Sequence, residues 1–206
     1  WSCLAVSLAG TLPFLFAGVI SWAHFDDALF ESISGFTCTG STILSDFGAV
    51  PQSILFYRSL TQWLGGMGLV VLAVAVLPAL GIGGLDLIAS EAPGPTADRL
   101  SLKVRDTARR LWLLYGAATC ILAIVLFLVG MSVFDAVTHA FTTIATGGYS
   151  PHAESIAYFD SFVVELVVIA GMLFAGANFS MHWRALSDGI RAYGSVSETR
   201  WYVSLI

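Results

Sequence analysis

Two short stretches rich in threonine and glycine contain the residues of this chain best suited to binding an ion. They read FTCTGSTIL at 36–44 and TTIATGGYS at 142–150. Backbone carbonyl oxygens can replace the hydration shell of a cation, as in potassium selectivity filters, and glycine permits backbone angles that let successive carbonyls point the same way. We expect three consecutive residues of each stretch to supply such carbonyls: Cys38, Thr39 and Gly40, and Thr146, Gly147 and Gly148.

The two stretches occur in register within a repeated pattern. Each follows an acidic residue and a short, partly apolar run, and Gly40 lies as far after Asp27 as Gly148 lies after Asp135. A run of about ten residues forms about three helical turns, or about 15 Å, which is too short to cross a membrane. We expect each run to be a re-entrant pore helix with its aspartate as N-cap. The negative partial charge at its C-terminus favours a cation.

The composition indicates the environment of these segments. The chain of 206 residues is 57% hydrophobic and 11% charged, whereas a soluble domain carries about a quarter charged residues. Four windows lack Asp, Glu, Lys and Arg, and each is close to or above the roughly 18–20 residues of a spanning helix: 1–25, 59–85, 111–134 and 166–183. We therefore expect an all-α integral membrane protein with four transmembrane helices.

The distribution of charge predicts the orientation in the bilayer. Eight of the nine basic residues lie between positions 99 and 110 or between 184 and 200, and the segments 24–58 and 135–165 are acidic apart from Arg58. Basic loops stay on the cytoplasmic side of a membrane. The acidic segments are therefore expected outside, with both ends of the chain cytoplasmic.

These observations predict parallel repeats of a transmembrane helix, a re-entrant pore helix, a filter loop and a second transmembrane helix. The predicted boundaries are a first repeat at 1–80 with pore helix 27–36 and filter 37–41, a cytoplasmic linker at 81–107, a second repeat at 108–186 with pore helix 135–143 and filter 145–149, and a linker with the start of a third repeat at 187–206. The chain opens on Trp1 and stops within apolar sequence, so we expect it to be part of a longer protein.

Four stretches resemble the membrane subunit of the Trk/Ktr/HKT potassium-transporter superfamily, most closely its bacterial TrkH branch: FESISGFTCTGSTIL at 30–44, RSLTQWLGGMGLVVLAVAVLP at 58–78, SEAPGP at 90–95 and HAFTTIATGGYSPHAESIAYFDS at 139–161. The resemblance implies four repeats around one pore in one polypeptide, of which this chain holds the first two. It also implies that Gly40 and Gly148 are the filter glycines, with the K⁺-coordinating carbonyls beside them. Thr37 and Ala145, at the starts of the two filters, are supporting residues.

The resemblance further implies a function and partners. The function is potassium uptake across the bacterial cytoplasmic membrane, with K⁺ as the transported ion, no catalytic cofactor and no enzyme activity. The partners are the lipid bilayer, a second membrane subunit in a homodimer and a cytosolic nucleotide-binding regulatory subunit of the TrkA type, with no nucleic acid. Since two filters supply half a ring, the chain as written is not expected to conduct by itself.

Arg58, the single basic residue of the outer segments, opens the second spanning window. We expect it to pair with Glu31 or Glu165 and to orient the pore loop, because an intramembrane charge usually has a partner; the alternative is an arginine that snorkels to the interface. The small residues of LGGMG at 64–68 favour close helix packing. The outer carboxylates of Asp26, Asp27 and Asp46 could concentrate cations.

Two other functions stay open from the residues alone. An alternating-access carrier would bind a cation near the membrane midplane, with Na⁺ or H⁺ as a coupling ion. An intramembrane enzyme would need converging catalytic groups, and the four histidines have no HExxH spacing. We expect a filter to lose selectivity on Gly40→Ser, an enzyme to tolerate that change, and a carrier to show slow, saturable counterflow.

Overall fold

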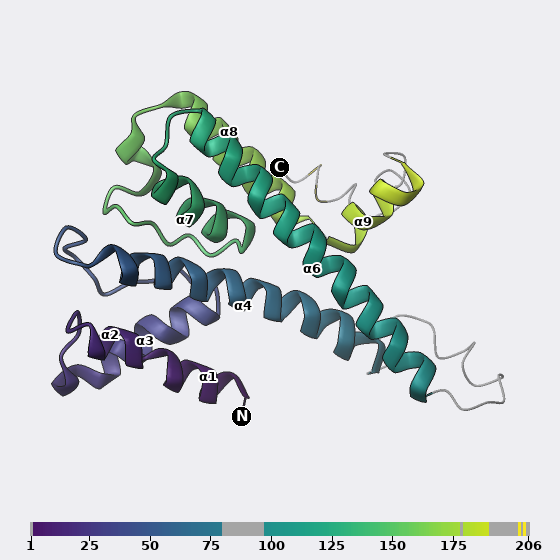
Figure 1. Ribbon diagram of the computed structural model, residues 1–206, viewed down its shortest axis with the longest axis horizontal. Coiled ribbons are helices and arrows are strands. Elements are labelled where there is room, and N and C mark those ends of the chain that lie inside the picture. The colour runs from purple at the N-terminus through teal and green to yellow at the C-terminus, as the bar shows by residue number, and fades with distance from the viewer. Residues whose placement is uncertain (1, 80–96, 178, 190–201, 203, 205–206) are drawn as a thin grey trace. The chain divides into compact units, whose positions relative to one another are not determined.

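The computed structural model describes residues 2–79, 97–177, 179–189, 202 and 204 (Figure 1). Every regular element within these residues is a helix, and they contain no strand, which agrees with the all-α prediction. The chain divides into two compact units, residues 1–66 with 118–176 and residues 67–117 with 177–206. Both predicted filters belong to the first unit.

The first half of that unit is built around the first pore helix. Its elements are α1 (Ser2–Gly10), α2 (Leu12–Phe16), η1 (Trp22–His24), the pore helix α3 (Phe25–Phe36) and the first part of α4 (Gln52–Ala79). α3 packs against α1, where the Ser32 hydroxyl donates to the Ser7 carbonyl at 2.7 Å. Buried apolar side chains form a core among α2, α3 and α4: Phe14, Leu15, Ala28, Ile54 and Leu55.

The second half of the unit repeats this plan. It contains the end of α6 (Ala97–Leu128), the pore helix α7 (Val133–Ile144), η2 (Ser155–Phe159) and α8 (Phe162–Gly176). α7 packs against α8. The contact is close at Gly171 of α8, where an added Cβ would lie 2.9 Å from the Thr143 Cγ2 atom and 3.1 Å from Leu122 Cδ2. A glycine at this position lets the pore helix lie against its neighbours.

The two pore helices are copies of one another in length and position. α3 and α7 each contain 12 residues. Both the first and the last residue of α7 lie 108 positions after those of α3. Each starts two residues before its predicted start, and α7 also ends one residue later than predicted. The repeat inferred from Gly40 and Gly148 therefore extends to the whole short helix.

The prediction that Asp27 and Asp135 cap these helices is wrong. The N-cap of α3 is His24, which makes no side-chain capping bond, and the N-cap of α7 is Ser132, whose Oγ accepts from the Asp135 N–H at 3.1 Å. Both aspartates lie in the first turn, where a carboxylate interacts favourably with the helix dipole. The Ser132 hydroxyl in turn donates to Asp135 Oδ2 at 2.8 Å, so serine and aspartate together resemble a capping box.

Two charge-free windows contain shorter helices than predicted. Of the described residues, Ala108–Leu128 alone is long and apolar enough to cross a membrane, and Ala5–Phe16 and Phe162–Gly176 are shorter apolar helices. The first window is interrupted at Thr11, between α1 and α2. Pro13, in the first turn of α2, lacks the N–H that would continue the helical ladder from α1. The charge-free windows thus located the apolar segments correctly but overestimated the length of these two helices.

The second unit contains the start of α6 and α9 (Phe179–Asp188). The Tyr115 and Phe179 rings lie 5.5 Å apart, and the Arg110 guanidinium lies 5.5 Å from the Trp183 ring centroid. Within the predicted linker 81–107, residues 97–107 form the first part of α6. Residues 80–96, and most of the predicted segment 187–206, lie outside the described residues.

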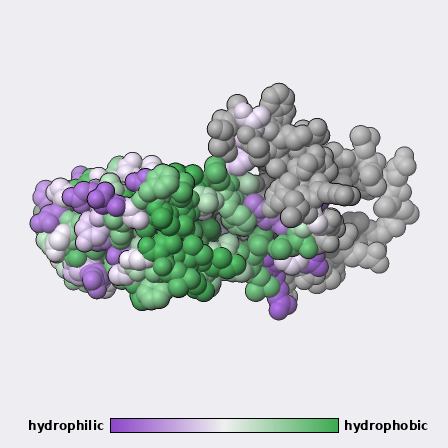
Figure 2. Space-filling view, turned by 90° about the horizontal axis from the view of Figure 1, so that it is seen from above, coloured by the Kyte–Doolittle hydropathy of each residue, from purple (hydrophilic) through white to green (hydrophobic). Residues whose placement is uncertain are grey.

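The surface of the first unit carries a broad hydrophobic band. Figure 2 shows this band over the helices, with hydrophilic side chains gathered at the end of the unit that holds its loops. Large exposed apolar side chains of α6 and α8 contribute to it: Ile121, Ile124, Phe127, Phe162, Val163, Leu166 and Ile169. An exposed apolar face of this extent is typical of a protein surface that contacts lipid or another protein.

Candidate cation filter

The two filters, residues 37–41 and 145–149, leave their pore helices through the same backbone turn. In the first, the Cys38 N–H donates to the Gly35 carbonyl at 3.0 Å and the Thr39 N–H to the Ser34 carbonyl at 3.0 Å. In the second, the Thr146 N–H donates to the Thr143 carbonyl at 3.0 Å and the Gly147 N–H to the Thr142 carbonyl at 2.8 Å. The bonds join equivalent positions, so the turn is repeated bond for bond.

Backbone angles repeat in the same way. Cys38 and Thr146 are non-glycine residues in the left-handed region, with φ of 55° and 54°, and Gly40 and Gly148 have φ of 78° and 86°. A left-handed residue other than glycine costs about 1–2 kcal/mol, and such strain gathers at functional sites. Its occurrence twice, at equivalent positions of the predicted ion-binding segments, favours a functional reason for this conformation.

The two filters touch at their glycines. A Cβ added to Gly40 would overlap the carbonyl oxygen of Gly147, whereas a Cβ added to Gly148 would have no heavy atom within 4 Å. Gly40 therefore needs to be glycine for its φ and for the close approach of the second filter. Gly148 needs to be glycine for its φ alone.

Gln62 of α4 holds the second filter, although it belongs to the first repeat. Its Nε2 donates to the Gly147 carbonyl at 3.0 Å, and its Oε1 accepts from the Tyr149 N–H at 3.1 Å. Its backbone carbonyl accepts from the Cys38 thiol at 3.2 Å. The side chain is fully buried. Its spacing from Arg58 places both residues on one face of α4, and a buried polar pair in an apolar helix is the signal that sequence reasoning missed.

A buried ion pair supports the first filter loop. Arg58 Nε lies 3.2 Å from Glu31 Oε2, and the side chains are 1% and 0% exposed. Of the two predicted partners, Glu31 is thus the one that Arg58 contacts, and Glu165 is exposed on α8. Glu31 Oε1 accepts from the Thr42 hydroxyl and, at 2.8 Å, from the Ile43 N–H. The carboxylate thereby ties the segment that follows the filter to the pore helix.

Tyr149 connects the second filter to this ion pair. Its hydroxyl lies 3.1 Å from both the Glu31 carbonyl oxygen and Glu31 Oε2, and it can donate to either. The Arg58 guanidinium lies 4.1 Å from the Tyr149 ring centroid, within the range of a cation–π contact. The two filters therefore share one network of buried polar groups.

A neutral pair takes the place of the ion pair in the second repeat. His139 Nε2 lies 3.2 Å from the Ser150 Oγ, and His139 Nδ1 lies 2.8 Å from the Asp135 carbonyl oxygen. At the start of α7, His152 Nε2 lies 2.9 Å from Asp135 Oδ1, and the His152 ring stacks on Tyr158 with centroids 3.7 Å apart.

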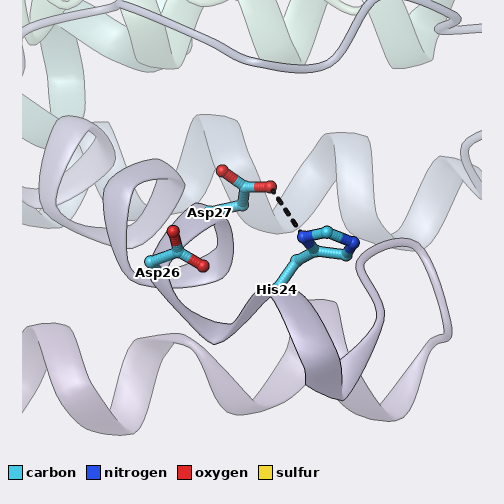
Figure 3. A group of neighbouring side chains, drawn as sticks. All are labelled: His24, Asp26 and Asp27. Atoms are coloured by element: carbon cyan, nitrogen blue, oxygen red, sulfur yellow. Dashed lines mark ion pairs between the residues drawn. The ribbon is translucent and has the colours of Figure 1, made fainter.

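Two of the three carboxylates predicted to concentrate cations lie near the start of α3. The third, Asp46, lies in the loop before α4, where its Oδ1 accepts from the Gly48 N–H at 3.0 Å. Figure 3 shows Asp26 and Asp27 beside His24, with the Asp27 carboxylate turned toward the imidazole. His24 Nδ1 and Asp27 Oδ2 are 3.8 Å apart, and the three side chains could approach one ion. They are exposed or half-exposed, which equally suits a solvated helix start.

The two remaining predicted residues begin their filters. The Thr37 hydroxyl donates to the Ile33 carbonyl at 2.7 Å and lies 2.7 Å from the Thr39 hydroxyl, and Ala145 is buried. Gly65, in the small-residue run of α4, approaches α3 so closely that an added Cβ would overlap the Phe36 carbonyl. The run therefore serves close packing, as predicted.

Comparison with known proteins identifies relatives over nearly the whole chain. The TrkH family of cation transport proteins matches residues 2–200. The Trk system potassium uptake protein TrkH of Vibrio parahaemolyticus is 44% identical over 182 residues, which is 88% of this chain and 37% of that protein. The protein of the same name in Escherichia coli K12 is 42% identical over 198 residues, or 95% of this chain and 41% of the relative.

A solved structure has the same fold. The crystal structure of the potassium transporter TrkH from Vibrio parahaemolyticus matches with a TM-score of 0.83 and 39% identity, covering 98% of this chain and 40% of that one. The chain thus spans about two fifths of the length of the relatives it matches. The match of the family over residues 2–200 and the identities above 40% lead to one conclusion: this chain belongs to the TrkH family of cation transport proteins.

Proposed function

We propose that this chain forms half of a carbonyl-lined potassium filter, and that the complete protein takes up K⁺ as the pore-forming subunit of a Trk-type system. One observation carries the proposal. Two segments in register adopt the same unusual backbone conformation, and each begins at the C-terminus of a short buried helix.

The physical chemistry of these segments suits a weakly bound cation. The dipole of each pore helix places about half a negative charge at its C-terminus, and the filter carbonyls can replace water around K⁺. The proposed ligands are the backbone carbonyls of Cys38, Thr39 and Gly40 and of Thr146, Gly147 and Gly148. The Gly147 carbonyl already accepts from Gln62, so one of its two lone pairs is occupied.

The surroundings of the second filter support access for an ion. Thr146, Gly147 and Gly148 line a pocket of about 340 Å³. Since two filters supply half a ring, the other ligands are assigned to the part of the protein that the relatives have beyond this chain.

The names of the relatives, which are proteins of a Trk potassium uptake system, support an assembly with further components. We place the protein in the bacterial cytoplasmic membrane, with both ends of this segment cytoplasmic. The proposed partners are a second membrane subunit and a cytosolic nucleotide-binding regulatory subunit. The observations favour a filter over an enzyme, because His139 and His152 are engaged in bracing the loop that follows the second filter.

The test is cation flux into liposomes that contain the full-length protein, with K⁺ and Na⁺ compared. Wild-type protein is expected to favour K⁺, and Gly40→Ser to erode that preference, because its side chain would displace the Gly147 carbonyl. Gly116→Ser, the same change at a helical glycine of α6 where an added Cβ has no heavy atom within 4 Å, is the control and is expected to retain the preference. An unchanged K⁺/Na⁺ flux ratio in Gly40→Ser would contradict a filter. Slow, saturable counterflow would favour a carrier.

A further inference from the structure

Gln62 has an unusual position for a residue of a spanning helix. It is fully buried, it comes from the first repeat, and both polar atoms of its side chain contact the filter of the second repeat. The nearest comparable side chain on α4, Arg58, is directed instead to Glu31 of its own repeat. The contacts of Gln62 therefore join the repeats at the backbone that is proposed to bind the ion.

The two bonds flank a single filter residue. Gln62 Nε2 contacts the carbonyl of Gly147, and Gln62 Oε1 contacts the N–H of Tyr149, so Gly148 lies between two fixed points. A primary amide is planar and presents its donor and acceptor in a fixed relation. Gly148 has φ of 86° and free space around its Cα, so its own packing does little to hold it.

We propose that Gln62 is a positioning residue for ion selectivity: a side chain of the first repeat sets the carbonyl geometry of the second filter. The inference rests on the proposed filter function and adds a residue that acts through the filter without contacting the ion. Gln62 fixes the direction of the Gly147 carbonyl, and its N–H reduces the negative charge that this oxygen offers to a cation. Selectivity depends on the number and field strength of such oxygens.

The same contact links the two filters mechanically. The Gly147 oxygen that accepts from Gln62 is also the atom that a Cβ on Gly40 would overlap. A rotation of this carbonyl therefore changes the space available to the first filter as well. The Gln62 backbone carbonyl, which accepts from Cys38, adds a second link to the first filter from the same residue.

Two substitutions remove one or both of the hydrogen bonds from the Gln62 side chain to the second filter. Gln62→Glu has nearly the same shape and keeps an oxygen for the Tyr149 N–H, but it replaces the donor to Gly147 with a second oxygen. Gln62→Met keeps the length and removes both bonds. Gln52→Glu is the matched control, because it makes the same chemical change at an exposed position on the same helix.

The experiment measures K⁺ and Na⁺ flux through the full-length protein in liposomes. We expect the K⁺/Na⁺ ratio to fall about fivefold for Gln62→Glu, the effect of one hydrogen bond of typical strength, and further for Gln62→Met. Gln52→Glu should stay within about twofold of wild type.

Thermal unfolding of the same proteins in K⁺ and in Na⁺ separates positioning from a general loss of stability. An ion that binds the folded state raises the melting temperature, so the Gln62 variants should lose the extra stabilisation by K⁺. A merely structural role would lower both melting temperatures equally. The inference is overturned if wild type selects K⁺ and both Gln62 variants keep its flux ratio and its K⁺ stabilisation. An unselective wild type would instead refute the proposed function itself.

Discussion

The first and second filters share a backbone but differ in the side chains that brace it. Glu31 and His139 occupy the seventh position of their pore helices, and each contacts a hydroxyl at the equivalent position after the filter, Thr42 or Ser150. The first contact belongs to a buried ion pair with Arg58, and the second is neutral. The contact between pore helix and filter segment, which we call the brace, thus keeps its position in both repeats while its side chains differ.

The difference indicates which features the filter requires. The helix end, the left-handed residue and the glycine occur in both copies, so we propose that these features turn the filter carbonyls toward the ion. The brace needs only to join the pore helix to the segment that follows the filter, and an ion pair or a histidine–serine contact can do so. The first brace serves both repeats, because Tyr149 of the second filter contacts Glu31 and Arg58.

The largest expected effect comes from breaking the ionic brace. Arg58→Met leaves the fully buried Glu31 carboxylate without its countercharge, and removal of one partner of such a pair costs about 3–5 kcal/mol. His139→Gln, in the neutral brace, should cost about 1 kcal/mol, the value of a typical hydrogen bond. Thermal unfolding of the purified full-length protein, together with Rb⁺ uptake, measures both.

A double variant is the control for this prediction. Arg58→Met with Glu31→Gln removes both charges and should recover part of the lost stability, since an unpaired buried charge costs more than an apolar or neutral pair. Equal losses of stability for Arg58→Met and His139→Gln would contradict the stronger, ionic character of the first brace.

The next comparison concerns the two filter glycines. Gly40→Ala should reduce the K⁺/Na⁺ flux ratio about tenfold or more, because its Cβ overlaps the Gly147 carbonyl and a shift worth about 1.4 kcal/mol is already tenfold. Gly148→Ala meets no neighbour and suffers only from its φ, a cost of about 1–2 kcal/mol in stability. Flux and thermal unfolding of the two variants, measured together, would contradict the account if Gly148→Ala proved the more damaging to selectivity.

The smallest effect is expected at the starts of the pore helices. Asp135 is buried against Ser132 and His152, so Asp135→Asn should destabilise the protein by about 1 kcal/mol. The equivalent Asp27 is half-exposed and faces His24 at 3.8 Å, so Asp27→Asn should cost less than about 0.5 kcal/mol. Urea or thermal unfolding measures the loss of stability in each variant. A larger loss for Asp27→Asn than for Asp135→Asn would contradict the contacts described at the two helix starts.

Much of the fold could be predicted because it depends on local patterns. The spacing of Asp27 to Gly40 and of Asp135 to Gly148 predicted two pore helices in register, and the structure extends this match to both helix ends. The N-caps were misassigned because serine at position 132 competes with the aspartate for the same role. The length of the helix near Pro13 was overestimated because a window without charge reports the polarity of a segment and not where its helix breaks.

The bracing contacts could be predicted only in part. Arg58 could be assigned a carboxylate partner because a buried charge needs one, but the choice of Glu31 over Glu165 depends on packing. Gln62 and Tyr149 were missed because their partners lie in the other repeat, at sequence separations of 85 for Gln62 and 118 for Tyr149. A polar pair in an apolar helix indicates that Gln62 needs a partner, but no local pattern identifies that partner.

The central claim is that the carbonyls of residues 38–40 and 146–148 bind a cation together. Anomalous X-ray scattering from crystals of the full-length protein grown in Rb⁺ tests this most directly. The account predicts Rb⁺ peaks within coordination distance of both segments, and weaker peaks in crystals of Gly40→Ala. Peaks confined to the exposed carboxylates of Asp26 and Asp27, with none between the filters, would contradict this binding.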